Sequence, residues 1–326
     1  MVQVVVTHDV KKEEYEILKE TLSPIADVVL LPGLAQNDRG MALKSADVLL
    51  TWSPTRDLKA EELALITNAK MMQLLSAGAD HVPFSKLPPN LFVAANIGAY
   101  ADPIAEHVLA MILALKKNLI DRHCKLRKGQ FDQANPNRML RGSSCAILGF
   151  GGIGKATARL LRCFDVKILA LNTSGRTNEQ VDFIGTLKDM ERVMRLADIV
   201  IISIPLTEAT RSLIGERELA WMRNDAILIN VARGEIVDEP ALYEKLKTHP
   251  NFMAGIDTWW NEPNGNEQFT TNYPFFELPN VVGSPHNSGN IPGIMNTAVS
   301  QAAQNVKRFL VGEKPIGVVR SDARLK

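Results

Sequence analysis

Short β-branched runs alternate with amphipathic stretches along almost the whole chain, and this alternation restricts the possible folds more than any other feature. Strand and helix in alternation are typical of parallel sheets covered by helices. One series of apolar runs ends near residue 96 and a second begins near Ser144, so we expect two sheets. The expected strands cover residues 2–6, 26–31, 46–52, 70–75 and 91–96 in the first series, and 145–150, 166–172, 198–205, 226–232, 253–258 and 281–286 in the second.

Two further expected helices lie outside these series and predict how the chain connects the two sheets. One covers about 103–120, and the other covers about 292–311 and stops at Gly312. We infer that the chain leaves its first domain before the earlier helix and returns to it at the later one. A length of 326 residues fits two domains at about 150 residues each. The predicted domains are residues 1–100 with 290–326, and residues 101–289.

Composition argues against several classes of partner. The net charge of +1 gives no electrostatic reason to expect nucleic acid or an anionic membrane. The three cysteines show no metal-ligand spacing, and an odd number is typical of reduced thiols in the cytosol. The N-terminal segment resembles a short strand followed by charges rather than a signal peptide, and the most apolar helix candidate, residues 104–115, is too short to cross a bilayer. We therefore expect a cytoplasmic protein with no metal site, no membrane segment and no nucleic-acid partner.

The glycine-rich turn GFGGIG lies between an expected strand and an expected helix, and it matches the pattern GxGxxG. The helix leads into another apolar strand, so the motif occupies a complete βαβ unit. In such a unit the first glycine permits a tight turn, the second lets backbone approach a pyrophosphate, and the third allows close packing of helix and strand. Free N–H groups at the helix N-terminus favour an anion. The predicted dinucleotide-binding residues of this turn are Gly149, Gly151, Gly152, Ile153 and Gly154.

The next strand ends in ILALNTSGR, where a dinucleotide site usually carries an acid about 20 residues past its glycines. That acid hydrogen-bonds the 2′-hydroxyl of NAD and repels the 2′-phosphate of NADP. Asn172 stands here instead, and an amide can bind ribose without repelling phosphate. Thr173 and Ser174 offer hydroxyls, and the guanidinium of Arg176 matches phosphate geometry, although a solvated loop charge explains Arg176 equally well. We therefore expect NADP, or the use of both NADP and NAD.

Three polar residues follow apolar strands of the second series. Arg233 comes after AILINVA, Glu262 stands in DTWWNEP, and His286 ends VVGSPH. In open parallel sheets, ligands bind outside the carboxyl ends of the strands, so these side chains could converge on one site. Taken singly, each has an ordinary structural explanation, because a lone histidine after a strand is more often a packing or surface residue.

Taken together, these motifs resemble the D-isomer-specific 2-hydroxyacid dehydrogenase family. The resemblance covers nearly the whole chain and rests on GFGGIG, SIPLTEATRSLI, INVARGEIVDEPAL, AGIDTWWNEP and SPHNSG, with SAGAD and AEH before them. In that family a discontinuous, flavodoxin-like substrate domain surrounds a Rossmann dinucleotide-binding domain. The resemblance therefore implies an α/β fold of two doubly wound parallel-sheet domains. It also implies an NAD(P)-dependent interconversion of 2-oxo acids and D-2-hydroxy acids.

The resemblance implies roles for individual residues as well. Arg233 would hold the substrate carboxylate and polarise the carbonyl oxygen, a task that suits a planar, permanently charged guanidinium. His286 would exchange a proton with that oxygen, since imidazole ionises near neutral pH, and Glu262 would orient the imidazole. The other implied cofactor-binding residues are Pro205, Thr210, Val231, Ala232, Asp257, Ser288 and Gly289. The implied substrate-binding residues, besides Arg233, are Trp52, Ala77, Gly78 and Tyr100.

Three features depart from the family pattern. The amide at Asn172 argues against strict NAD dependence. The segment 265–280 is long for the link between Glu262 and His286, and it predicts a flap or a contact with a partner. The tripeptide SPH lacks the glutamine expected near the histidine of formate dehydrogenases, which argues against formate as the substrate.

The resemblance further implies a homodimer, paired partly through RHCKLRKGQFDQ, in which Phe131 could anchor a partner. Two other functions remain open. One is D-3-phosphoglycerate dehydrogenase, which neither Asn172 nor the apolar character of the expected pocket supports. The other is a non-catalytic NAD(H)-sensing protein similar to transcriptional co-repressors. Such sensors often carry extra tails, and the lack of a long polar tail or low-complexity arm in this sequence favours the enzyme.

Overall fold

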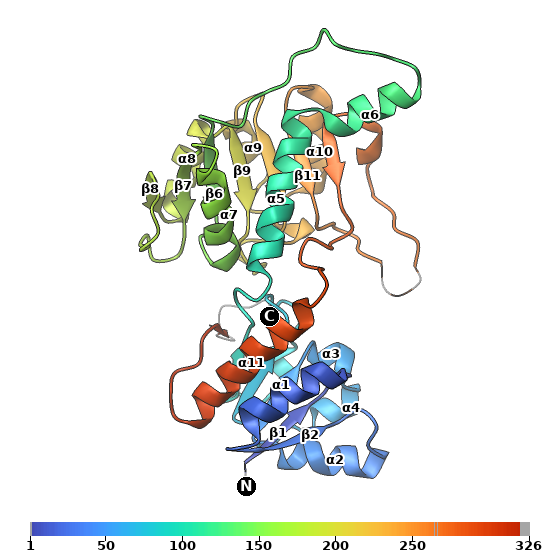
Figure 1. The fold of residues 1–326 in the computed structure, drawn as a ribbon, viewed down its shortest axis with the longest axis vertical. Helices are drawn as coiled ribbons and strands as arrows, with labels where there is room; N and C mark the ends of the chain where they lie inside the picture. Colours follow the sequence, from blue (N-terminus) through green and yellow to red (C-terminus); the bar gives the residue numbers. More distant parts are fainter. Residues whose placement is uncertain (1, 264, 266, 320–326) are drawn as a thin grey trace. The chain divides into compact units, whose positions relative to one another are not determined.

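The computed structural model describes residues 2–263, 265 and 267–319, and the chain divides into two units. Unit 1 is formed by Met1–Tyr100 and Ile291–Lys326, and unit 2 by Ala101–Asn290. Each unit contains one sheet with helices packed on it (Figure 1). The expected α/β class, with two doubly wound parallel-sheet domains, is therefore confirmed.

The sheet of unit 1 has six strands in the order β13–β5–β4–β3–β1–β2. Strands β1 to β5 are parallel and follow the flavodoxin-like order, in which the first strand lies between the second and the third. β13 pairs antiparallel with β5, which the sequence does not predict because a strand of two residues has no periodicity. The strands are β1 Gln3–Val6, β2 Asp27–Leu30, β3 Val48–Thr51, β4 Met71–Leu74, β5 Phe92–Ala94 and β13 Val318–Val319.

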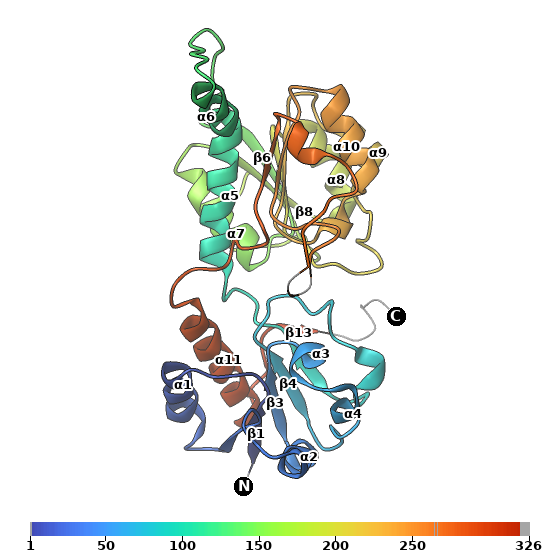
Figure 2. The same ribbon diagram turned by 90° about the vertical axis from the view of Figure 1, so that its right-hand side faces the viewer.

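The last helix of the chain, α11 (Ile294–Leu310), completes the core of unit 1. Val299 and Val306 lie on one stripe of this helix and are fully buried in a cluster with residues of β1 and of α1 (Lys12–Leu22). Figures 1 and 2 show α1 and α11 side by side on one face of the sheet. Because the apolar stripe of α11 is buried in the core of unit 1, the end of the chain returns to that unit, and unit 1 is formed by two separate segments. Its remaining helices are α2 Gln36–Ser45, α3 Pro54–Asp57 and α4 Ala60–Leu63, with a 3-10 turn at Phe84–Lys86.

The sheet of unit 2 has seven parallel strands in the order β12–β11–β10–β9–β6–β7–β8. Read from β8, this is the Rossmann order with one additional strand at the far edge. The central strands are buried along their whole length, as their continuous apolar runs predict. The strands are β6 Ser144–Leu148, β7 Lys167–Leu171, β8 Phe183–Gly185, β9 Ile199–Ile202, β10 Ile227–Asn230, β11 Met253–Ile256 and β12 Val281–Gly283.

In unit 2, α5 (Ala101–Lys116) and α7 (Gly152–Arg162) pack together on one face of the sheet, and α8, α9 and α10 cover the other (Figure 2). The single helix expected at 103–120 is wrong, because the chain breaks at Asn118, whose φ of +48° is left-handed. Asparagine adopts this conformation more readily than most residues. None of the described helices is long and apolar enough to span a membrane. The other helices are α6 Leu119–Arg127, α8 Met190–Leu196, α9 Glu216–Trp221 and α10 Glu239–Thr248, with 3-10 turns at Leu187–Asp189, Gly234–Ile236 and Phe275–Glu277.

Candidate active site and dinucleotide site

The turn GFGGIG joins β6 to the N-terminus of α7. Gly149 has a φ of +100°, in a region that side chains rarely adopt. A Cβ added to Gly154 would lie 2.3 Å from the carbonyl oxygen of Gly149, so only glycine lets the helix begin this close to the strand. A Cβ on Gly151 would meet no atom within 4 Å. Open space beside the N-terminus of α7 fits the pyrophosphate of a dinucleotide.

The side chain of Asn172 shapes the loop after β7. Its Oδ1 accepts hydrogen bonds from the N–H groups of Ser174, at 3.1 Å, and Gly175, at 2.7 Å. Its Nδ2 donates to the carbonyl oxygen of Arg176 at 2.8 Å. An aspartate could accept the first two bonds but could not donate the third. The amide therefore has a local role that the sequence does not reveal, while Thr173, Ser174 and Arg176 are exposed.

The other residues expected to contact the cofactor follow the carboxyl ends of neighbouring strands. After β9, the hydroxyl of Thr210 donates to the carbonyl oxygen of Pro205 at 2.7 Å and so holds that loop. Val231 and Ala232 follow β10 and are buried. Ser288 is also buried, and Gly289, next to it, is partly buried.

Arg233 lies in the turn after β10, and the last residue of that strand holds the turn. Asn230 is 2% exposed, its Nδ2 donates to the carbonyl oxygen of Arg233 at 2.8 Å, and its Oδ1 accepts the N–H of Ala232 at 3.1 Å. A Cβ added to Gly234 would lie 2.4 Å from the carbonyl carbon of Trp259. The turn that carries Arg233 therefore packs directly against the turn that follows β11.

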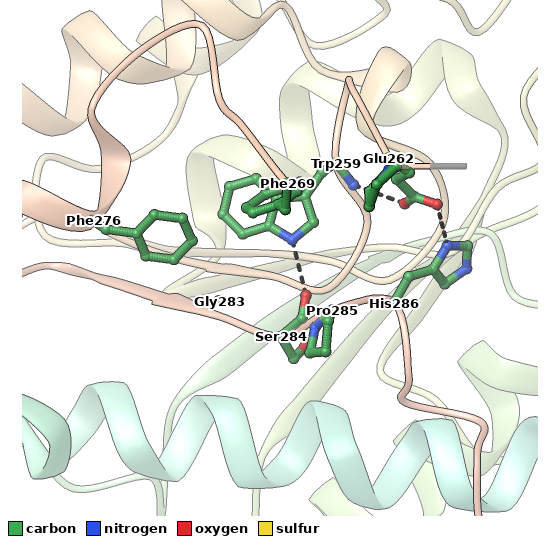
Figure 3. Close-up of a pocket in the computed structure, with 9 residues that line it drawn as sticks. Trp259, Glu262, Phe269, Phe276, Gly283, Ser284, Pro285 and His286 are labelled. Carbon is green, nitrogen blue, oxygen red and sulfur yellow. Dashed lines mark hydrogen bonds and ion pairs between the residues drawn. The ribbon is translucent and has the colours of Figure 1, made fainter. Parts of the chain in front are cut away.

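His286 and Glu262 meet at the carboxyl ends of β12 and β11 (Figure 3). The distance between His286 Nδ1 and Glu262 Oε2 is 2.7 Å. The other carboxylate oxygen, Oε1, accepts the backbone N–H of Trp259 at 3.0 Å. The imidazole is 39% exposed. Because Nδ1 of His286 is hydrogen-bonded to Glu262, Nε2 is the ring nitrogen that can contact a substrate.

Arg233 lies near this pair, because its turn packs against Trp259, whose backbone N–H binds Glu262. Burial by itself would raise the pKa of the Glu262 carboxyl. The hydrogen bonds from His286 and from the N–H of Trp259, with the charges of His286 and Arg233, instead hold that pKa below its usual value. Glu262 is therefore ionised at neutral pH, and the structure brings Arg233, Glu262 and His286 together.

Asp257 directly follows β11, is fully buried, and binds the loop that carries His286. Its backbone carbonyl accepts the N–H of His286 at 2.8 Å. Its carboxylate accepts the N–H groups of Asn287, at 3.2 Å, and Ser288, at 3.4 Å. These bonds matter because His286 has a left-handed φ of +48°, a conformation that costs about 1–2 kcal/mol for a residue with a Cβ. Asp257 therefore holds a strained loop, a role the sequence does not reveal.

A cavity of about 350 Å³ lies beside the Glu262–His286 pair (Figure 3). Its walls are otherwise mostly apolar, and Trp259 is fixed in them because its Nε1 donates to the carbonyl oxygen of Ser284 at 2.8 Å. Among the described residues, no group of three or more His, Cys, Asp and Glu side chains could hold a metal ion. The other residues that line the cavity are Pro263, Phe269, Phe276, Gly283 and Pro285.

The segment 265–280, for which the sequence predicts a flap or a partner contact, packs into unit 2 over part of its length. Phe275 is fully buried, stacks on Trp260 at 5.5 Å and meets the edge of Tyr243. A flap is therefore wrong for this part of the segment, because its aromatic side chains complete a cluster within the unit. Phe276 remains 61% exposed at the rim of the cavity.

The predicted substrate-binding residues other than Arg233 lie in unit 1. The rings of Trp52 and Tyr100 meet edge to face at 6.4 Å. The hydroxyl of Tyr100 donates to the carbonyl oxygen of Leu75 at 3.0 Å, and burial raises the pKa of Tyr100 to about 12. Ala77 and Gly78 lie shortly after β4. The structure thus brings Trp52 and Tyr100 together.

Comparison with known proteins shows which family the chain resembles. Residues 109–288 match the family model for the D-isomer specific 2-hydroxyacid dehydrogenase, NAD binding domain. A glyoxylate reductase of Thermofilum pendens is 32% identical over 275 residues, which are 82% of this chain and 80% of that protein. A D-3-phosphoglycerate dehydrogenase of Methanocaldococcus jannaschii is 28% identical over 328 residues, but this chain spans only 59% of its length.

A solved structure is similar over its whole length. It is that of a provisionally assigned formate dehydrogenase from Pyrobaculum aerophilum, with a TM-score of 0.82 and 27% identity, and the match covers 99% of this chain and 100% of that one. The family model covers more than half of the described chain, including the glycine turn, Arg233, Glu262 and His286. The chain therefore belongs to the D-isomer specific 2-hydroxyacid dehydrogenase family, and unit 2 contains the NAD-binding domain of that family.

Proposed function

We propose that the chain is an NAD(P)-dependent oxidoreductase that interconverts a 2-oxo acid and a D-2-hydroxy acid. The observation that carries the proposal is the 2.7 Å contact between His286 Nδ1 and Glu262 Oε2, with the charge of Arg233 close by. A glycine turn suited to a dinucleotide lies at the carboxyl end of a strand in the same sheet. A proton donor, a cation and a dinucleotide site are the components that reduction of a 2-oxo acid requires.

Each of the three side chains has a separate task. A nicotinamide dinucleotide held at the glycine turn 149–154 would supply the hydride that the reduction needs. The guanidinium of Arg233 binds the substrate carboxylate and polarises the carbonyl oxygen, because its parallel N–H groups match a carboxylate. Nε2 of His286 gives a proton to that oxygen, and takes it back when the hydroxy acid is oxidised. Glu262 holds Nδ1 and so orients the ring with Nε2 toward the substrate.

We further propose a small, unphosphorylated 2-oxo acid as the substrate, as the name of the Thermofilum pendens relative suggests. The test compares rates of NADH and NADPH oxidation with glyoxylate, hydroxypyruvate, pyruvate and phenylpyruvate, and of cofactor reduction with formate and D-3-phosphoglycerate. Oxidation of either cofactor by a 2-oxo acid is the expected result. Turnover of only formate or the phosphorylated acid would replace the proposed substrate. Dinucleotide binding without turnover of any acid would favour the sensor.

The cofactor that we propose is NADP, or both NADP and NAD. No carboxylate stands at the end of β7, and the exposed guanidinium of Arg176 forms no hydrogen bond or ion pair with the residues that the structure describes. A 2′-phosphate beside Asn172 would therefore be attracted by the cation of Arg176 and would meet no carboxylate at the strand end.

Replacing Asn172 with Asp is expected to lower the ratio of NADPH to NADH efficiency by about five- to tenfold. A new carboxylate near a 2′-phosphate costs about 1 kcal/mol in a solvated loop. The variant also loses the bond to the carbonyl of Arg176, so kcat/KM for both cofactors is measured and only their ratio is compared. Arg176→Gln is the complementary variant and should lower the same ratio. An unchanged ratio in both variants would rule out this interpretation of the loop.

The proposed assembly is a homodimer. Apolar side chains are exposed on α6 and on the segment that follows it, and Phe131 is 76% exposed. A row of exposed apolar residues is typical of an interaction surface. Sedimentation velocity is expected to give twice the mass of the chain, and Phe131→Ser should shift the equilibrium toward monomer, whereas Met41→Ser, at another exposed apolar residue, should not. A monomeric wild-type protein at micromolar concentration would contradict the proposal. The exposed apolar residues are Leu119, Ile120, Leu126, Phe131 and Met139.

A further inference from the structure

A line of three polar side chains leads from the middle of α5 to the loop that carries His286. Nε2 of His107 lies 2.9 Å from Oγ of Ser284, and that oxygen lies 2.6 Å from Oδ1 of Asp257. The three residues come from α5 and from the carboxyl ends of β12 and β11, which pack against that helix. The proposed mechanism gives neither His107 nor Ser284 a task.

The direction of these hydrogen bonds follows from counting protons. The carboxylate of Asp257 is fully buried and receives bonds from the hydroxyl of Ser284 and from two backbone N–H groups. The hydroxyl of Ser284 donates to Oδ1, so its single proton is already used in that bond. Oγ of Ser284 must then accept a hydrogen bond from the Nε2–H group of His107. The donors therefore run in one direction, from His107 to Ser284 to Asp257, whether or not the imidazole is charged.

We call His107, Ser284 and Asp257 the relay. It ends at the backbone N–H groups of the two residues that follow His286. The Asp257 carboxylate accepts the N–H groups of Asn287 and Ser288, so its orientation determines the course of the loop. His286 has a left-handed backbone, and a residue keeps such a conformation only where its surroundings hold it. We propose that His107 and Ser284 are positioning residues, which act through Asp257 to keep His286 aligned for proton transfer. The inference rests on the proposed acid–base role of His286.

Ser284→Ala removes the central hydroxyl, and it is expected to lower kcat by about 10- to 100-fold, because small misplacements of a catalytic group cost that much. The Tm should match that of the wild type. Ser284→Thr keeps the hydroxyl and should restore kcat to within about threefold of the wild type. His107→Leu should resemble Ser284→Ala. His249→Leu is the matched control, since that histidine bonds only to the hydroxyl of Thr248 among the described side chains, and it should leave kcat unchanged.

Hydrogen–deuterium exchange of the peptide that contains Asn287 and Ser288 gives a second measurement, which needs no turnover. Faster exchange in Ser284→Ala, by about tenfold or more, and wild-type exchange in Ser284→Thr are expected. In one outcome the wild type reduces no 2-oxo acid, while Ser284→Ala still exchanges faster and Ser284→Thr does not. That result would contradict the proposed function and would support the relay. Unchanged kcat and exchange in Ser284→Ala would overturn the relay. The relay would also be overturned by a loss of kcat that Ser284→Thr does not restore, or by one that comes with a large fall in Tm.

Discussion

Replacing His286 with Gln is expected to lower kcat for 2-oxo acid reduction by about three orders of magnitude. Glutamine can still hydrogen-bond to Glu262, but its amide neither gives nor takes a proton near neutral pH. The carbonyl oxygen would then develop negative charge without a proton donor. The Kd for NADPH or NADH, measured by fluorescence titration without substrate, should be unchanged because the glycine turn on α7 is untouched.

The control separates loss of the acid from loss of the fold. His249→Gln changes another histidine of unit 2 in the same way and should keep the wild-type kcat. The Tm of His286→Gln should remain close to that of the wild type, because the imidazole is 39% exposed and little packing is lost. A folded His286→Gln variant that binds the dinucleotide and keeps more than about a tenth of the wild-type kcat would contradict the mechanism.

Replacing Arg233 with Lys is expected to lower kcat/KM for the 2-oxo acid by about 100-fold, although the positive charge is kept. A single ammonium cannot present two parallel N–H groups to a carboxylate and polarise the carbonyl at the same time. The backbone of the turn should persist, because Asn230 bonds to the main chain at Ala232 and Arg233, not to the guanidinium. Steady-state kinetics with one cofactor at saturation measure the effect.

The matched control for this variant is Arg211→Lys. Arg211 forms an ion pair with Glu235 on the surface of unit 2, and exposed pairs of this kind contribute little. It should keep the wild-type kcat/KM. If Arg233→Lys and Arg211→Lys are equally active, Arg233 does not bind the substrate carboxylate in the proposed way.

Several features of this site could be predicted because they depend on local patterns. The period of apolar residues distinguishes strands from helices, and the spacing of Gly149, Gly151 and Gly154 marks a strand–turn–helix unit. Arg233, Glu262 and His286 could be grouped because parallel strands bring their carboxyl ends to one edge of a sheet. The structure places all three at that edge, and their catalytic roles remain predictions.

Other expectations failed where local pattern was a poor guide. Nothing in the apolar period of 103–120 shows that the helix breaks at Asn118, since the break depends on a single left-handed residue. The segment 265–280 has the composition of a loop, yet Phe275 is buried because Trp260 and Tyr243 lie where they can enclose it. The sequence predicts a cofactor contact for the amide of Asn172, and this stays a prediction, but the pattern does not show that the amide also bonds within its own loop.

The amino-acid sequence by itself determined the class of fold, the place of the glycine turn and the residue types at the strand ends, because these follow from spacing along the chain. Only the tertiary structure decided how His286 is held. His107, Asp257 and Ser284 are far apart in sequence, and they meet because α5 packs on β11 and β12. Hydrogen bonds act over about 3 Å, so a partner on another element becomes known only when the sheet and its helices are assembled.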